Sequence, residues 1–114
     1  MASSITREAL KQKLAQEKSF HLVEVLSEEE FRRLHIAGAV HIPFNRMGTE
    51  ARKRFHKDDE IVLYCMDAEC RASSIAAEKL EGMGFTNIAI FSGGKQDWVA
   101  GGLPVEGEAA GAAS

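Results

Sequence analysis

The chain has 114 residues, of which 45% are hydrophobic and 27% are charged, and its formal net charge at pH 7 is -3. This length and composition suit one globular domain with a modest hydrophobic core. The small negative charge gives no reason to expect nucleic acid or a membrane as a partner.

Apolar spacing and turn residues predict helices that alternate with short strands. In chain order, these are a helix over residues 7–16, a strand over 21–26, a helix over 28–34, a strand over 38–42, a helix over 47–54, a strand over 61–64, a helix over 72–83, a strand over 87–91 and a helix over 96–100. Thr6 is suited to cap the first helix, residues 27–30 form a capping box, and Gly84 suits the position after a helix end. This alternation predicts an α/β fold with a central, mainly parallel sheet covered by helices on both faces.

The predicted core comes from the strands and from the helix over 72–83. We expect these residues to be mostly buried: Leu22, Val23, Val25, Ile61, Val62, Leu63, Ile75, Leu80, Ile88, Ile90 and Phe91. Residues 107–114 contain only Gly, Ala, Glu and Ser. Such a segment has little to bury, so we expect a folded domain over residues 1–106 and a disordered tail over 107–114.

The most informative segment begins with the strand over 61–64, which ends at Cys65 and is followed by a polar loop and a helix. Ligand sites of open α/β sheets lie beyond the carboxyl ends of the strands. A helix N-terminus offers free N–H groups and partial positive charge, which favour a thiolate. The arrangement therefore predicts a nucleophilic Cys65. The alternative is a buried structural cysteine, but the polar loop favours the nucleophile.

Several motifs in the right order resemble the rhodanese-like domain family, from Ile5 to Glu106. They are Leu22-Val23-Glu24-Val25 with Glu30-Phe31, His35 through Pro43, Tyr64-Cys65, Gly84-Phe85, Ser92-Gly93-Gly94 with Trp98, and Gly102-Leu103-Pro104-Val105. The resemblance implies a three-layer α/β/α domain with sulfurtransferase activity. In this family, the cysteine takes a sulfane sulfur from a donor, holds it as a persulfide and passes it to a thiophilic acceptor.

The resemblance assigns Cys65 as the nucleophile and persulfide carrier. It implies a loop whose N–H groups stabilise the negative sulfur and bind the anionic substrate, formed by Met66, Asp67, Ala68, Glu69, Cys70 and Arg71. Arg71 either attracts an anionic donor or is simply an exposed arginine. We expect no cofactor and no metal, because the histidines are not spaced for a zinc site with the cysteines.

Three departures from the family pattern affect the expected chemistry. The usual Asp-Val-Arg is Glu24-Val25-Leu26 here, so an arginine near the mouth of the site is missing. The loop is longer than usual, with an alanine where glycine is common and a second cysteine. It also carries Asp67 and Glu69, whose charges oppose thiolate formation and repel anionic donors unless they point away. We therefore expect weak activity with thiosulfate and better use of a less anionic donor.

Two other functions remain as alternatives. The spacing of Cys65 and Arg71 is also that of cysteine-dependent phosphatases and arsenate reductases, but the two loop carboxylates would repel a phosphate dianion. A non-catalytic binding module is the second alternative, and the retained cysteine argues against it.

Cys70 has two interpretations that the sequence leaves open. It is either a resolving thiol, which closes a disulfide with a modified Cys65, or a small packing residue at the start of a helix. For the remaining residues we predict a structural hydrogen bond at His35, a polar strand-end position for His41 and a core position for Trp98. At Gly93 and Gly94 we predict that the backbone needs a positive φ or a close approach of another group.

The expected partners are a small-molecule or protein-bound sulfur donor and a thiol acceptor, with no nucleic acid or membrane, and the chain is expected to be a monomer. Two cysteines five positions apart are not a disulfide framework of the secreted kind, and the first residues lack the apolar core of a signal peptide. The expected compartment is a reducing cytoplasm.

Overall fold

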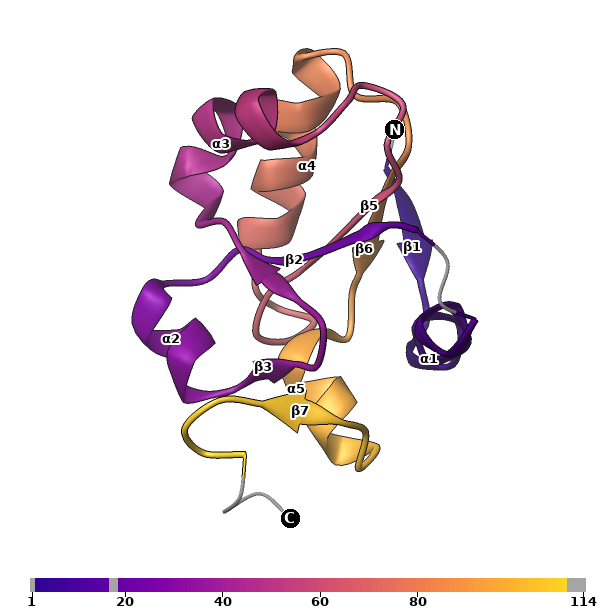
Figure 1. The fold of residues 1–114 in the computed structure, drawn as a ribbon, viewed down its shortest axis with the longest axis vertical. Helices are drawn as coiled ribbons and strands as arrows, with labels where there is room; N and C mark the ends of the chain where they lie inside the picture. Colours follow the sequence, from indigo (N-terminus) through magenta and orange to yellow (C-terminus); the bar gives the residue numbers. More distant parts are fainter. Residues whose placement is uncertain (1, 17–18, 111–114) are drawn as a thin grey trace.

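A five-stranded parallel sheet lies at the centre of the computed structural model, which describes residues 2–16 and 19–110 (Figure 1). In chain order, the elements are β1 Ser3–Ile5, α1 Arg7–Ala15, β2 His21–Glu24, α2 Glu28–Arg33, β3 His35–Ile36, β4 Val40–His41, the 3-10 helix η1 Phe44–Arg46, α3 Met47–Arg54, β5 Ile61–Tyr64, α4 Ala72–Gly82, β6 Ile88–Phe91, α5 Gly94–Ala100 and β7 Val105–Glu106.

The strand order is β1-β6-β5-β2-β4, and every neighbouring pair is parallel. β5 therefore lies in the middle of the sheet, with β6 on one side and β2 on the other. Glu24 pairs in register with Tyr64, so the carboxyl ends of β2 and β5 meet at one edge. Because Cys65 follows Tyr64 directly, it is placed at that edge. The predicted α/β fold with a central parallel sheet is confirmed.

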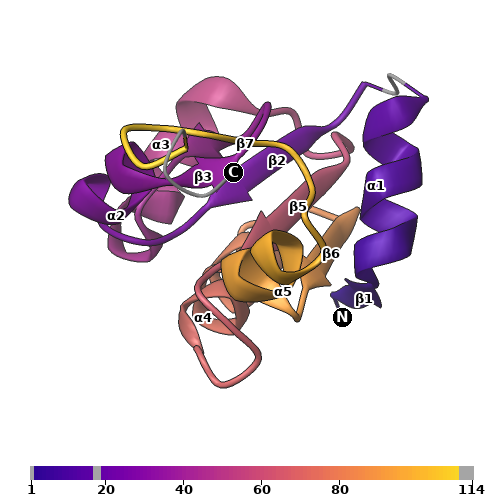
Figure 2. The ribbon, with the colours of Figure 1, turned by 90° about the horizontal axis from the view of Figure 1, so that it is seen from below.

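Alternate residues of the central strands point to opposite faces of the sheet, as strand geometry requires. Val23, Ile61 and Leu63 pack in one hydrophobic cluster with residues of α3 and α4. Leu22, Val62 and Tyr64 pack in a second cluster that includes Leu10 of α1 and Trp98 of α5. In Figures 1 and 2, α3 and α4 cover one face, and α1 and α5 lie on the other. Burial on both faces explains why β5 is a continuous apolar run.

Most of the predicted core is buried, with two exceptions. Ile75 is 47% exposed, because α4 presents a different stripe to the sheet, formed by Ser73, Ala76, Ala77 and Leu80. Ile90 is only partly buried. It lies on β6, whose outer neighbour is the three-residue edge strand β1.

Several boundaries and short elements differ from the sequence prediction. The expected strand over 21–26 ends at Glu24, the strand over 38–42 shrinks to Val40–His41, and the last helix begins two residues earlier, at Gly94. The other expected elements differ by one residue at an end or agree. β1, η1 and the antiparallel pair β3–β7 were not predicted, because elements of two or three residues leave no periodic pattern.

The expected disordered tail makes ordered contacts in its described part. The backbone N–H groups of Glu108 and Ala109 donate to the carbonyls of Arg32 and Arg33, at 2.9 and 2.8 Å. This lays residues 108 and 109 against the end of α2. Residues 111–114 lie outside the described residues. No helix of the described chain has the length and apolar character needed to cross a membrane.

Candidate active site

Cys65 lies immediately after β5, with its side chain enclosed by the loop that leads to α4. The residue is 1% exposed. Its Sγ lies 3.4 Å from the carbonyl oxygen of Cys70 and 3.5 Å from Oγ of Ser73. Ser73 is the second residue of α4, so the helix N-terminus faces the thiol as the sequence pattern indicates. The predicted strand-loop-helix arrangement around Cys65 is therefore present.

Asp67 shapes the loop by binding its backbone. Its Oδ1 accepts hydrogen bonds from the N–H groups of Glu69 and Cys70, both at 3.1 Å, and its carbonyl oxygen lies 3.2 Å from the Cys70 nitrogen. This is the local turn that aspartate side chains commonly form. The Asp67 carboxylate thus folds the chain back and brings Cys70 next to Cys65.

The start of α5 closes the loop from the other side. The N–H groups of Lys95 and Gln96 each donate at 2.8 Å, to the carbonyl oxygens of Cys65 and Met66 respectively. Gly94 has φ +70, and a Cβ there would lie 2.7 Å from the Cys65 carbonyl oxygen and 2.8 Å from the Asp67 nitrogen. Both parts of the predicted backbone requirement are confirmed for Gly94. Gly93 has an ordinary φ of -65, so the positive-φ part of the prediction is wrong there, and the three atoms nearest to a Cβ at Gly93 belong to the Asp97 side chain.

Gly94→Ala is expected to destabilise the fold by about 2–4 kcal/mol, because φ strain and a clash with backbone atoms add together. Gly102→Ala is the matched control, since its φ is +68 but no atom lies within 4 Å of the added Cβ. The control is expected to lose only about 1 kcal/mol from φ strain. Urea unfolding of both variants measures the difference. Equal losses would show that the close approach to the Cys65 loop has no energetic weight.

The two thiols of the loop have pKa values that shift in opposite directions. Burial raises the pKa of Cys65, and its hydrogen bond to the Cys70 side chain acts the same way, while the hydroxyl and N–H of Ser73 oppose the shift. The expected stabilisation of a Cys65 thiolate by the helix N-terminus is thus present, but burial outweighs it.

Cys70 is partly exposed, and its pKa is lowered. Its own desolvation and the charge of Asp67 work against this shift. They are outweighed by hydrogen bonds from the Cys65 thiol and from the N–H groups of Met66 and Ala72. The Asp67 charge thus acts on Cys70. Cys70 is consequently the more acidic thiol of the pair.

The remaining loop residues lie toward solvent. Ala68, Glu69 and Arg71 are exposed, whereas Met66 is partly buried. Arg71 occupies the N-cap position of α4, just before the first helical residue. Its exposure fits the simpler of the two predicted roles, and an anion-attracting role stays a prediction.

Sequence reasoning missed a buried ionic network directly beneath the loop. Glu24, Tyr64 and Lys95 are at most 2% exposed. Lys95 Nζ lies 3.1 Å from Glu24 Oε2 and donates to the Glu30 carbonyl oxygen at 3.0 Å. Tyr64 Oη donates to Glu24 Oε1 at 2.9 Å and accepts from the Ile36 N–H at 3.0 Å. Burial raises the pKa of Glu24, and Lys95 and Tyr64 partly offset this. The network ties α5, and with it the Cys65 loop, to β2.

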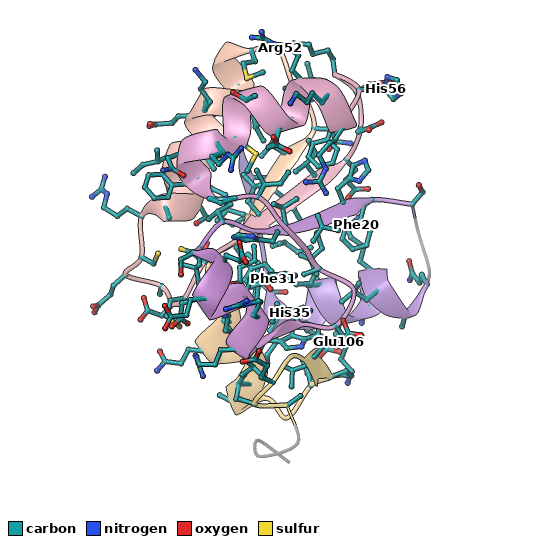
Figure 3. All side chains as sticks on the ribbon, turned by 60° about the vertical axis from the view of Figure 1, so that its left-hand side comes forward. Phe20, Phe31, His35, Arg52, His56 and Glu106 are labelled. Carbon is teal, nitrogen blue, oxygen red and sulfur yellow. The ribbon has the colours of Figure 1, made fainter. Side chains whose placement is uncertain are left out.

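The histidines make structural contacts. His35 Nδ1 lies 2.7 Å from the Phe31 carbonyl oxygen, and its ring stacks on Phe31 with centroids 3.8 Å apart (Figure 3). His41 Nε2 lies 2.6 Å from the carbonyl oxygen of Leu26. These contacts confirm the hydrogen-bonding role predicted for His35. In the part of the chain that the structure describes, no group of three or more His, Cys, Asp and Glu residues is arranged to hold a metal ion.

Trp98 is a core residue, as predicted. It is 2% exposed and meets Phe91 edge to face, with centroids 6.1 Å apart. Its indole N–H donates to the Pro104 carbonyl oxygen at 2.8 Å, which satisfies the buried polar atom.

Comparison with known proteins places these features in one family. The model of the rhodanese-like domain matches residues 6–101. A curated relative from Bacillus subtilis, "Putative sulfur carrier protein YrkF", is 33% identical over 94 residues, which cover 82% of this chain and 49% of the relative. The chain therefore spans about half the length of the curated relative that it matches.

Two solved structures are similar over nearly the whole chain. The rhodanese-like domain of the Anabaena protein Alr3790 is 28% identical, with a TM-score of 0.86 over 95% of this chain and 81% of that one. The BH2092 protein of Bacillus halodurans is 26% identical, with a TM-score of 0.86 over 93% of this chain and 77% of that one.

Proposed function

Because this chain belongs to the rhodanese-like domain family, we propose that it is a sulfurtransferase that carries a sulfane sulfur as a persulfide on Cys65. The acceptor is a thiol or another thiophilic group. The observation that carries the proposal is the position of Cys65, at the carboxyl end of the central strand β5 with the N-terminus of α4 facing its sulfur. The relative YrkF, of which the match covers 49%, is named a putative sulfur carrier protein, and this name is consistent with sulfur handling.

The proposed reaction has two displacement steps at sulfur. In the first, the Cys65 thiolate attacks the sulfane sulfur of a donor R–S–SH, forms Cys65–S–SH and releases R–S⁻. In the second, an acceptor thiolate attacks the outer sulfur and frees the Cys65 thiolate. The Ser73 hydroxyl and N–H stabilise negative charge on the Cys65 sulfur. The chemistry needs no general base once the thiolate has formed.

The donor class follows from the charges of the loop. The Asp67 charge acts on Cys70, and Asp67 is fixed in the loop by its turn, while Glu69 is exposed two residues later in the same loop. A dianionic donor such as thiosulfate meets repulsion from both carboxylates, whereas a singly charged or protein-bound persulfide meets less. We therefore propose a small-molecule or protein-bound persulfide as the preferred donor and thiosulfate as a poor one.

Neutralising both carboxylates is expected to raise thiosulfate turnover by about 3–5-fold, an effect typical of exposed charges in salt solution. The variant is Asp67→Asn with Glu69→Gln, because asparagine keeps the side-chain oxygen that accepts from the loop N–H groups. Glu78→Gln, on the exposed face of α4, is the matched control. Steady-state rates with thiosulfate at low ionic strength give the readout. An unchanged rate would mean that the carboxylates do not oppose the donor.

The phosphatase or arsenate reductase alternative is less favoured by the site. Arg71 is exposed at the N-cap position of α4, and the loop that would hold the dianion contains the carboxylate of Asp67. The alternative of a non-catalytic binding module is distinguished from sulfur transfer by whether Cys65 takes up a sulfane sulfur.

The test is sulfur loading followed by peptide mass spectrometry. Reduced wild type and Cys70→Ser are treated with glutathione persulfide, and free thiols are then alkylated. In Cys70→Ser, a labile mass increase of one sulfur atom is expected on the Cys65 peptide, and a thiol acceptor should remove it. Failure of Cys70→Ser to take up sulfur from glutathione persulfide, polysulfide or thiosulfate would refute the proposed function in favour of a binding module.

A further inference from the structure

We propose that Cys70 resolves the Cys65 persulfide by releasing its outer sulfur as sulfide and closing a Cys65–Cys70 disulfide. This activity would make the domain a persulfide reductase as well as a sulfur carrier. The proposal rests on the proposed function, because it begins from a persulfide on Cys65.

The first support is the proximity of the two residues. Cys65 Sγ lies 3.4 Å from the carbonyl oxygen of Cys70, so the two residues are in direct contact, and each thiol affects the pKa of the other. Three contacts from Asp67 to the N–H groups of Glu69 and Cys70 hold the chain in this turn. A disulfide needs Cα atoms within about 7 Å and sulfur atoms that can approach each other. The folded loop holds the backbone of Cys70 against the Cys65 sulfur, and in the proposed step the Cys70 side chain approaches that sulfur from within the same loop.

The second support is the contrast in exposure. Cys65 is 1% exposed, whereas Cys70 is partly exposed. The outer sulfur of a Cys65 persulfide would be formed inside the loop, with Cys70 as a neighbouring thiol. Cys70, in turn, is the sulfur at which an external reductant can attack the disulfide. The arrangement separates a protected sulfur carrier from an accessible exchange site.

The third support is the charge distribution. In the reduced loop the pKa of Cys70 is lowered, because its desolvation and the charge of Asp67 are outweighed by hydrogen bonds from the Cys65 thiol and from the N–H groups of Met66 and Ala72. The two N–H groups do not depend on the state of Cys65, so they also favour a Cys70 thiolate beside the persulfide. Thiol–disulfide chemistry proceeds through the thiolate, so the attacking species is present where the step requires it.

The proposed step converts a persulfide and a thiolate into a disulfide and sulfide. The Cys70 thiolate attacks Sγ of Cys65–S–SH, a bond forms between the two Sγ atoms, and the bond from Cys65 Sγ to the outer sulfur breaks and leaves HS⁻. The sulfane sulfur gains two electrons, and the two cysteines lose them as they become a disulfide. Turnover then needs an external dithiol reductant, which exchanges with the disulfide through Cys70.

The test is a single-turnover measurement on the full chain without added reductant. Reduced wild type, Cys70→Ser and Cys70→Ala are mixed with a stoichiometric amount of glutathione persulfide, sulfide is measured, and alkylated peptides are mapped. We expect wild type to release close to one sulfide per chain and to lose both alkylatable thiols. We expect both Cys70 variants to keep the persulfide on Cys65 and to release at least about tenfold less sulfide. Thermal unfolding of the variants checks that they are folded.

Three other outcomes would overturn one of the two proposals. A wild-type Cys65 persulfide that is as long-lived as that of the Cys70 variants would refute resolution and leave sulfur transfer standing. A persulfide recovered on Cys70 would also refute it, because the sulfur would have been relayed and not released. If the Cys70 variants form no persulfide and wild type releases no sulfide, the proposed function itself is refuted.

Discussion

Cys65→Ser is expected to lower sulfur transfer to a thiol acceptor by at least about 10³-fold, which is the scale of losses when a catalytic nucleophile is removed. Serine is close in size to cysteine, and its hydroxyl can hydrogen-bond to the Cys70 carbonyl that now faces Cys65 Sγ. An alcohol cannot hold a sulfane sulfur as a persulfide does. The measurement is the rate of sulfide formation from glutathione persulfide with dithiothreitol as acceptor.

The control for this loss separates chemistry from folding. Cys65 belongs to the main hydrophobic cluster, so the unfolding midpoint of Cys65→Ser must be measured beside its activity. Activity above about one tenth of wild type in the folded variant would contradict the assignment of Cys65. Cys70, the more acidic thiol, would then be the nucleophile, and a double replacement of Cys65 and Cys70 would confirm this by abolishing the remaining rate.

The central strands and their alternation with helices were predictable, because burial on both faces of the sheet leaves short apolar runs in the sequence. Residues 61–64 and 88–91 are short apolar runs followed by polar or glycine-containing turns, and both are strands of the parallel sheet. By contrast, the edge strand β1 contains Ser3-Ser4-Ile5 and is a strand only because β6 supplies its partners. Strand pairing of this kind depends on tertiary neighbours that no local pattern contains.

The position of Cys65 was predictable, but its environment was not. The strand-to-helix pattern placed the thiol correctly next to the N-terminus of α4. The direction of its pKa shift depends on burial, and the loop is covered by the start of α5, about thirty residues later in the chain. The loop carboxylates were likewise visible, but the use of Asp67 as a turn-forming acceptor follows only from the folded geometry.

The Glu24–Lys95 ion pair is the part of the site that the sequence concealed most completely. Each residue is charged and stands beside a recognisable motif, yet both are almost fully buried. Among the described residues, Glu24 Oε2 has no hydrogen bond of good geometry, so the charge of Lys95 at 3.1 Å is its main compensation. Removing one partner of a buried pair leaves an uncompensated charge, which costs more than the intact pair contributes.

Lys95→Met is therefore expected to lower the free energy of unfolding by about 3–5 kcal/mol, a large share of the stability of a small domain. The loss should depend on pH. A carboxyl whose pKa is raised on folding contributes stability below its ordinary value of 4.5, and this contribution is lost as pH rises through the raised value. Without Lys95 the pKa of Glu24 rises further. The stability that Lys95→Met loses relative to wild type is therefore largest at neutral pH and shrinks as pH falls toward 4.5. Urea unfolding across this pH range measures it.

The double variant Glu24→Gln with Lys95→Met tests whether the lost stability comes from the stranded charge. A neutral amide can still accept from Tyr64 Oη, which now donates to Glu24 Oε1, so we expect the double variant to regain more than half of the loss and to lose most of its pH dependence. Lys53→Met, on the exposed face of α3, is the matched control and should change stability by no more than about 0.5 kcal/mol. If Lys95→Met is as stable as wild type at neutral pH, Glu24 has taken up a proton at little cost. The ion pair would then have no role in holding α5 against the Cys65 loop.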